Sequence, residues 1–152
     1  MQSRLGGGGT GWYPEMRRLA QNQVQQLENI NLSASGHLVL NQFMDELATS
    51  RTCFSPFGYG ELCWRDIEAF QTGAVLIKPD MGHLETKPHL YEPGVTYLPV
   101  RWDFADLDDV VQDALSDEPR MEHISQEAWN RAARYIREND FVNDMIEIFS
   151  DN

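Results

Sequence analysis

The chain has 152 residues, of which 41% are hydrophobic, 11% aromatic and 24% charged, and this size and composition are typical of one folded domain. No apolar run approaches the roughly 20 residues of a membrane-spanning helix, and no export signal is recognisable, so we expect no membrane span and a cytoplasmic location. The net charge of −12 argues against a nucleic-acid partner, which requires a basic surface, unless a local basic patch overrides it. Cys53 and Cys63 fit no zinc or redox spacing and are expected to be reduced core residues.

The chain begins with a stretch that holds five glycines between Gly6 and Gly11. A glycine loop binds phosphate where it joins a strand to the N-terminus of a helix. No strand pattern precedes this stretch, and four consecutive glycines are typical of a flexible linker. We therefore predict a flexible tail over residues 1–13 and a single domain over residues 14–152.

Two helices are predicted next. Apolar residues recur at helical spacing from Pro14 to Ile30, and proline is well suited to the start of a helix. Residues 40–48 show a second, shorter helical pattern, with Asn41 as the expected cap.

The centre of the chain predicts a strand–helix–strand unit. Residues 52–55 form a short apolar strand that Pro56 ends, and a glycine loop leads from it into a helix over residues 61–71. Gly73 ends this helix, and residues 74–77 form an apolar strand. Strands that are apolar on both faces are typical of a parallel sheet covered by helices.

A third strand is expected over residues 95–100, and three amphipathic helices fill the remainder, the first with Asp103 as its cap. The predicted fold class is therefore α/β, with a small parallel sheet of three strands flanked by about six helices. So few strands suggest a doubly wound domain that is truncated at its N-terminal side.

The loop that leaves the first strand is the predicted ligand site, because ligands bind beyond the carboxyl ends of strands in open α/β sheets. Glu61 and Glu68 are expected on one face of the following helix, two turns apart, where they can span a nucleotide sugar. The alternative is that Glu61 only interacts with the helix dipole and that Glu68 is a surface residue. The residues expected at the end of the strand and in the loop are Ser55, Gly58, Tyr59, Gly60 and Glu61.

The segment after the second strand carries Asp80, His83, Glu85 and His89, which are residue types that bind metals. Their spacing matches no standard metal motif, so a polar loop with Glu85 near the substrate is favoured, and no metal is assigned. His83 is also a candidate general base, although the sequence shows no partner that would orient it. Seven acids and no base lie between residues 103 and 118, a pattern of a solvated helix face or of a docking surface for a basic partner.

Residues 43–86, FMDELATSRTCFSPFGYGELCWRDIEAFQTGAVLIKPDMGHLET, and residues 91–111, YEPGVTYLPVRWDFADLDDVV, resemble a known family. A strand that ends in Ser-Pro, a glycine loop, a helix bearing Glu-Ala and a second strand follow one another as in the C-terminal, donor-binding half of group 1 glycosyltransferases of the GT-B fold. The subgroup related to spore-maturation glycosyltransferases is the most similar. The resemblance extends from about residue 37 to residue 136.

The resemblance implies a Rossmann-like domain that binds a nucleotide-diphosphate sugar as donor substrate and uses no other cofactor. Glu68 matches the glutamate that holds the donor ribose, and the loop of residues 57–61 matches the loop against the sugar and diphosphate. Arg65, Lys78 and Arg101 are the remaining cations near this site. Glu61 and His83 are the catalytic candidates.

The chain has no room for the N-terminal acceptor domain of such an enzyme. The expected partners are therefore a nucleotide sugar and either a second copy of the chain, because a short parallel sheet leaves unpaired edges, or a separate chain with the acceptor domain. The alternative function is a non-catalytic binding or interaction module derived from a glycosyltransferase half.

Overall fold

The computed structural model describes residues 1–6, 10–28, 30–33, 36 and 38–150. Within these residues the chain forms six helices and three strands, so both predicted numbers agree with the structure. Part of the predicted glycine-rich tail, residues 7–9, and the first residue of the family resemblance, residue 37, lie outside the described residues. The elements in chain order are α1 Trp12–Gln26, α2 Leu40–Ala48, β1 Thr52–Phe54, α3 Trp64–Thr72, β2 Val75–Pro79, β3 Leu98–Val100, α4 Leu107–Ser116, α5 Glu118–Arg137 and α6 Asp140–Ser150.

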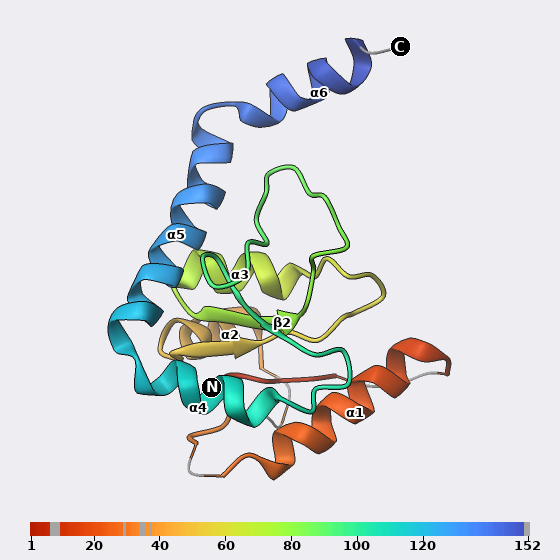
Figure 1. The fold of residues 1–152 in the computed structure, drawn as a ribbon, viewed down its shortest axis with the longest axis vertical. Coiled ribbons are helices and arrows are strands. Elements are labelled where there is room, and N and C mark those ends of the chain that lie inside the picture. The colour runs from red at the N-terminus through yellow and green to blue at the C-terminus, as the bar shows by residue number, and fades with distance from the viewer. Residues whose placement is uncertain (7–9, 29, 34–35, 37, 151–152) are drawn as a thin grey trace.

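The three strands form one parallel sheet in the order β1-β2-β3. Thr52 is aligned with Val75, and Ile77 with Leu98. The predicted strand–helix–strand unit is therefore confirmed as β1–α3–β2. The arrangement is α/β, with a small parallel sheet flanked by helices, and is consistent with a Rossmann-like fold (Figure 1).

The beginning of the chain extends this sheet on the free side of β1. The Gln2 amide donates to the Thr52 carbonyl at 2.8 Å, and the Gln2 carbonyl accepts from the Phe54 amide at 2.9 Å. Gln2 also forms a parallel bridge with Ser33, so the extended order is Ser33, Gln2, β1, β2, β3.

The predicted flexible tail needs correction over residues 1–5. Met1, Gln2, Ser3 and Leu5 are buried, because Gln2 supplies backbone partners to β1 and the apolar residues beside it enter the core. The glycine-rich stretch therefore does follow an extended segment of the sheet, and it leads into α1.

The core has two layers, one on each face of the sheet. Phe54, Val75 and Ile77 pack in one cluster with buried residues of α1 and α4. Cys53 and Leu76, which alternate with them, pack in the other cluster with buried residues of α2 and α3. Figure 1 shows the sheet between these two helical layers, with α5 along one side. Cys53 is a free buried cysteine, as predicted, whereas Cys63 is free but only half-buried at the start of α3, so its prediction as a core residue is wrong.

Several predicted helix boundaries differ from the structure. α1 begins at Trp12 rather than Pro14 and ends at Gln26. The residue that precedes α2 is Val39, not the expected cap Asn41. α4 follows Asp106 rather than Asp103.

The start of α3 matters most for the site. The helix begins at Trp64, because the Asp66 carboxylate accepts a hydrogen bond from the Cys63 amide at 3.2 Å and caps the helix there. Glu61 therefore lies in the turn before the helix. The prediction that Glu61 and Glu68 share one helical face is wrong.

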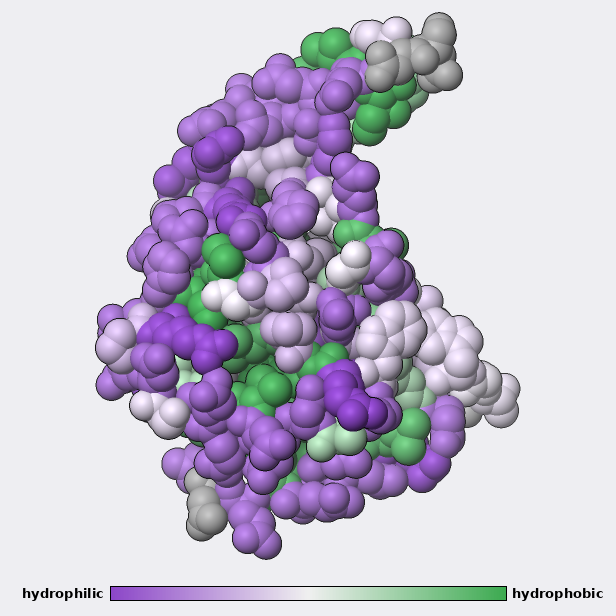
Figure 2. Space-filling model, in the orientation of Figure 1, coloured by the Kyte–Doolittle hydropathy of each residue, from purple (hydrophilic) through white to green (hydrophobic). Residues whose placement is uncertain are grey.

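α6 extends away from the rest of the molecule (Figure 1). Figure 2 shows apolar side chains exposed along it, in green at the top of the view. Among the described residues, no helix has the length and apolar character needed to cross a bilayer. The exposed apolar residues of α6 are Phe141, Val142, Ile146, Ile148 and Phe149.

Candidate functional site at the carboxyl ends of the strands

Among the residues that the structure describes, the extended sheet has a topological switch point between Gln2 and β1. From Gln2 the chain passes through α1 to Ser33 on one side, and then through α2 to β1 on the other side. The connections that leave Gln2 and β1 therefore diverge to opposite faces of the sheet, toward α1 and α3. In open α/β sheets, ligands bind outside the carboxyl ends of the strands at such a point.

Two arginines approach this point, Arg17 from α1 and Arg65 from α3. Arg17 donates to the Gly6 carbonyl at 3.3 Å and lies 5.0 Å from the centre of the Tyr13 ring. Arg65 donates from Nη2 to the Arg4 carbonyl. Neither arginine has a carboxylate within ion-pair distance among the described residues.

Part of each guanidinium group is buried without a hydrogen-bond partner. These atoms are Nε of Arg17 and both Nε and Nη1 of Arg65. Burial lowers the pKa of Arg17, and the neighbouring positive charge of Arg65 lowers it as well. Partial burial of two like charges without anionic partners lowers the stability of the folded protein. A bound anion would offset this cost.

The glycine loop after β1 lies directly against Arg17. The Gly58 amide donates to the Gly60 carbonyl at 3.0 Å, which closes a tight turn. A Cβ atom at Gly58 would lie only 3.3 Å from Cys63 Sγ and 3.6 Å from Arg17 Nη2. A side chain at position 58 would therefore crowd Cys63 Sγ, and it would be in ordinary contact with the arginine. Tyr59, which is 90% exposed, stacks on Tyr13 of α1 with ring centres 4.6 Å apart.

A hollow of about 480 Å³ adjoins Arg65 at the carboxyl ends of Gln2 and Ser33. Its lining combines apolar side chains with Arg65 and with Arg4, which pairs with Glu46 at 2.6 Å. Apolar walls beside a cation suit a flat ring system that carries a negatively charged group. The lining residues are Arg4, Leu5, Gly6, Gly36, Leu38, Phe43 and Arg65.

The structure supplies the orienting partner for His83 that the sequence did not reveal. His83 Nε2 lies 2.7 Å from a carboxylate oxygen of Glu61. The imidazole ring also packs edge-on against Trp102, with ring centres 5.2 Å apart. Trp102 is fixed in turn by its indole N–H, which donates to the Asp80 carbonyl at 3.1 Å. The pair therefore joins the loop after β1 to the loop after β2.

Other predicted site residues have different surroundings. Ser55 is fully buried and donates to Asp66 at 2.6 Å, so its hydroxyl is used inside the protein. Glu68 is half-buried on α3, and burial raises the pKa of its carboxyl while Arg65 lowers it. Glu85 is exposed on the loop after β2. Arg101 is exposed and pairs with Asp103 at 2.7 Å.

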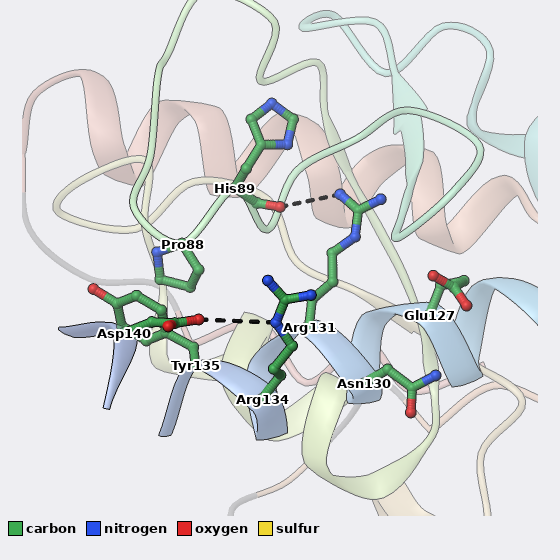
Figure 3. Close-up of a pocket in the computed structure, with 8 residues that line it drawn as sticks. All are labelled: Pro88, His89, Glu127, Asn130, Arg131, Arg134, Tyr135 and Asp140. Carbon is green, nitrogen blue, oxygen red and sulfur yellow. Dashed lines mark hydrogen bonds and ion pairs between the residues drawn. The ribbon is translucent and has the colours of Figure 1, made fainter. Parts of the chain in front are cut away.

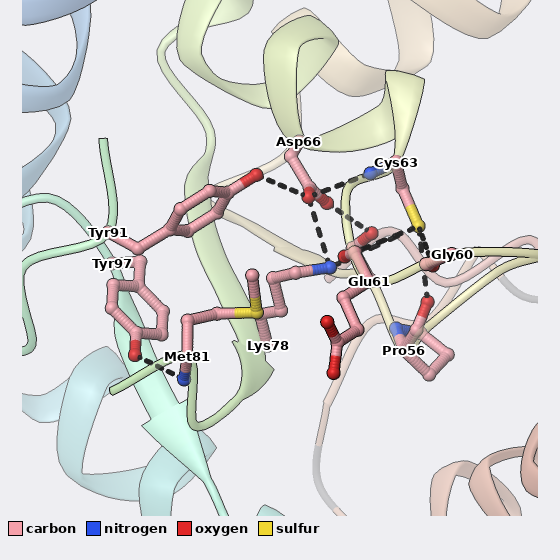
Figure 4. Close-up of polar contacts among 10 residues, drawn as sticks. Pro56, Gly60, Glu61, Cys63, Asp66, Lys78, Met81, Tyr91 and Tyr97 are labelled. Atoms are coloured by element: carbon pink, nitrogen blue, oxygen red, sulfur yellow. Dashed lines mark hydrogen bonds and ion pairs between the residues drawn. The ribbon is translucent and has the colours of Figure 1, made fainter. Parts of the chain in front are cut away.

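A buried polar network that sequence reasoning missed lies beneath the glycine loop (Figure 4). Lys78 and Asp66 are both fully buried and form an ion pair at 3.0 Å. The Tyr91 hydroxyl donates to the same carboxylate at 2.8 Å, and burial followed by the charge of Asp66 raises the pKa of Tyr91. The sequence does contain a signal for this network, because Lys78 directly follows an apolar strand and a buried lysine needs a partner of opposite charge. Lys78 therefore compensates a buried charge and is not exposed to a ligand, contrary to its prediction as a cation of the site.

Two further features are not assigned to the site. Within the described residues, no group of three or more His, Cys, Asp or Glu side chains is arranged to hold a metal ion. A second hollow of about 370 Å³ lies between α5, Asp140 and residues 88–89 (Figure 3). Its arginines are already engaged, since Arg131 pairs with Glu92 and Arg134 with Glu138.

No protein-family model matches the chain, and no curated protein matches it in sequence.

Proposed function

We propose that this chain is the donor domain of a glycosyltransferase and binds a nucleotide-diphosphate sugar at the switch point of its sheet. The observation that carries this proposal is the arginine pair. Arg17 and Arg65 converge on the carboxyl ends of the strands with buried N–H groups that have no partner. A diphosphate carries two adjacent anionic groups and accepts such donors in charge-assisted hydrogen bonds.

The surroundings of the arginines suggest places for the other parts of the ligand. Glu68 lies one helical turn after Arg65, where its carboxylate can accept from the ribose hydroxyls next to the diphosphate. The hollow beside Arg65 is lined by apolar side chains that suit the base. The sugar then extends along residues 58–61 toward the exposed ring of Tyr59.

In this proposal the two arginines do more than bind the donor. When the sugar is transferred, negative charge develops on the departing diphosphate, and fixed cations in a partly dehydrated site stabilise that charge. The acceptor-binding surface comes from another domain or chain. The alternative, a non-catalytic binding module, has the same ligand contacts but no turnover.

Donor binding is tested by thermal shift and by calorimetry with UDP-, GDP-, TDP- and ADP-sugars. A ligand at 100 times its dissociation constant stabilises a protein by about 2.7 kcal/mol, which is several degrees for a domain of this size. We expect one nucleotide class to give such a shift. No shift with any of these donors at millimolar concentration would overturn the proposal.

Variants locate the binding site. Arg17→Met and Arg65→Met keep the aliphatic stems but remove the charges, and each should weaken donor binding about 10- to 100-fold, since a hydrogen bond to a charged group is worth about 1.5–3 kcal/mol. Arg101→Met is the matched control, because Arg101 lies at the end of β3 and pairs with Asp103. Equal affinities for all four proteins would place the ligand elsewhere.

A further inference from the structure

We propose that Glu61 and His83 form a proton-transfer dyad that activates the acceptor hydroxyl, so that this chain supplies its own general base. This inference rests on the proposed donor binding and goes beyond it. The sequence predicts His83 as a base without an orienting partner and Glu61 as a residue of the following helix. The structure contradicts both views, because it joins the two side chains across 22 residues of sequence.

The geometry is that of a base held by an orienting carboxylate. His83 Nε2 lies 2.7 Å from Glu61 Oε1, an ordinary hydrogen-bond distance. Because Glu61 occupies Nε2, the other ring nitrogen, Nδ1, is left to exchange a proton with a ligand. The His83 side chain is 39% exposed and that of Glu61 32% exposed, so the pair is reachable from outside yet partly enclosed. A base whose second nitrogen is fixed by a carboxylate is the arrangement that activates hydroxyl nucleophiles in many enzymes.

The dyad is held in place from the His83 side by a small, ordered turn. The Asp80 carboxylate accepts from the Gly82 amide at 2.8 Å, and the Met81 amide donates to the Tyr97 hydroxyl at 3.0 Å. Trp102 packs against His83 and also against the buried ring of Phe57, with centres 5.1 Å apart in the second contact. The imidazole is therefore positioned by groups that are themselves fixed.

The dyad is also next to the proposed donor site. Glu61 directly follows Gly60, whose carbonyl closes the turn with Gly58, and Gly58 packs against Arg17. Three residues span at most about 11 Å, so Glu61 begins within that distance of the position where Arg17 meets the loop. A sugar attached to a diphosphate at Arg17 and Arg65 extends over a comparable length. The proposal therefore places the dyad beside the carbon at which the sugar is transferred.

The proposed reaction transfers the sugar from the diphosphate to the acceptor oxygen. His83 Nδ1 takes the proton from the acceptor hydroxyl, and the acceptor oxygen forms a bond to the anomeric carbon of the donor sugar. The bond between that carbon and the diphosphate oxygen breaks, and its electron pair leaves with the nucleoside diphosphate. Glu61 stabilises the imidazolium ion, whose proton then passes to solvent. With water as the acceptor, the products are the free sugar and the nucleoside diphosphate.

Water as acceptor makes the proposal testable before the natural acceptor is identified. The experiment measures release of nucleoside diphosphate from the nucleotide sugar that gives the largest thermal shift, together with the dissociation constant of that donor. His83→Gln should lower the rate of release at saturating donor by about 10²- to 10⁴-fold, the usual contribution of general base catalysis, while donor affinity changes less than twofold. Glu61→Gln keeps an oxygen acceptor but loses the charge, and should lower the same rate by about 10-fold without changing donor affinity. His89→Gln is the matched control, because His89 is exposed on the same loop.

A second measurement reports on His83 directly. Diethyl pyrocarbonate acylates accessible neutral imidazoles, and mass spectrometry locates the modified residue. Bound donor should protect His83 from modification and leave His123 of α5 unprotected. This readout separates a site next to the substrate from an ion pair that only joins two loops.

The outcomes separate the two proposals. Donor binding with wild-type release by His83→Gln overturns the dyad and leaves the donor domain intact. Donor binding without any release by the wild-type protein, or without protection of His83, also overturns the dyad. If no nucleotide sugar binds, the donor-domain proposal fails, and the dyad proposal fails with it.

Discussion

Lys78 and Asp66 are charged residues without solvent contact, and they define the chemistry of the core beneath the site. Asp66 accepts from Ser55, the Cys63 amide and Tyr91, and it pairs with Lys78, so its charge is well compensated. The charge of Lys78 is less well compensated. Its ammonium group contacts Asp66, makes a weak contact with Cys63 Sγ and lies 5.0 Å from the centre of the Phe57 ring. Loss of either charge leaves the other uncompensated in the core.

We therefore predict that Lys78→Met destabilises the protein by about 3–5 kcal/mol, the usual cost of breaking a buried pair. Adding Asp66→Asn to this variant should recover part of the loss, because the remaining buried charge disappears. Urea unfolding of the two single variants and the double variant measures the coupling. Additive effects of the two substitutions would show that the ion pair does not link them.

Individual contacts of the site were the least predictable features of the sequence. His83 and Glu61 belong to different loops, and only the parallel alignment of β1 and β2 brings them together. Arg17 was not identified because two adjacent arginines, Arg17 and Arg18, on a glutamine-rich helix form no recognisable binding motif. Arg17 becomes a candidate anion ligand only because the fold brings α1 next to the switch point.

Among the elements, Gly73 has the clearest requirement for glycine. It ends α3 with a φ of 81°, in the left-handed region, and its amide donates to Ala69. A Cβ atom there would lie 3.4 Å from Ser125 Oγ of α5, and that hydroxyl already donates to the Gly73 carbonyl. The residue thus ends the helix and joins it to α5.

Gly73→Ala should cost about 1 kcal/mol or more, because an L-residue is strained in this conformation. Thermal unfolding is expected to show a midpoint lowered by a few degrees. Gly60→Ala provides the comparison, since a Cβ atom at Gly60 meets open space and its φ is not positive. An equal effect of both substitutions would argue against backbone strain as the cause.

The sequence predicted elements well where the pattern was long or strongly punctuated. Residues 52–77 contain two apolar strands, a helical period and Gly73, and these signals gave the correct unit. The segment at Gln2 was missed because one bridging residue has no periodicity, and its pairing with β1 is a tertiary contact. Glu61 was placed on α3 because an acid is common in the first helical turn, whereas Asp66 caps that helix instead.

At the scale of the whole molecule, a net charge of −12 opposes association, whereas the exposed apolar residues of α6 favour it. The sequence predicts a second copy at an unpaired sheet edge, but Gln2 and Ser33 extend the sheet beyond β1. We propose that a second copy of the chain covers α6 instead. At least half of the surface of each of these apolar side chains is exposed, and an exposed apolar surface of this kind is typical of a protein–protein contact.

Sedimentation at micromolar protein and physiological salt should therefore show a dimer with twice the mass of the 17.5 kDa chain. Ile146→Asp combined with Phe149→Asp should dissociate it, because burying added charge at an apolar interface is costly. Leu40→Asp is a suitable control, as Leu40 is 70% exposed on α2. A monomer at every concentration would refute this prediction.

The insertion of Gln2 beside β1 also has a consequence for the order of folding. The unit β1–α3–β2 joins strands about 23 residues apart in sequence, whereas Gln2 must meet a strand 50 residues further along the chain. A contact between residues far apart in sequence closes a longer loop, and this costs more conformational entropy before the contact can stabilise the protein. We therefore expect the central unit to nucleate folding and the amino-terminal segment to dock late. Because Arg17 and the glycine-rich connection flank that segment, the proposed anion site would be completed only in this last step.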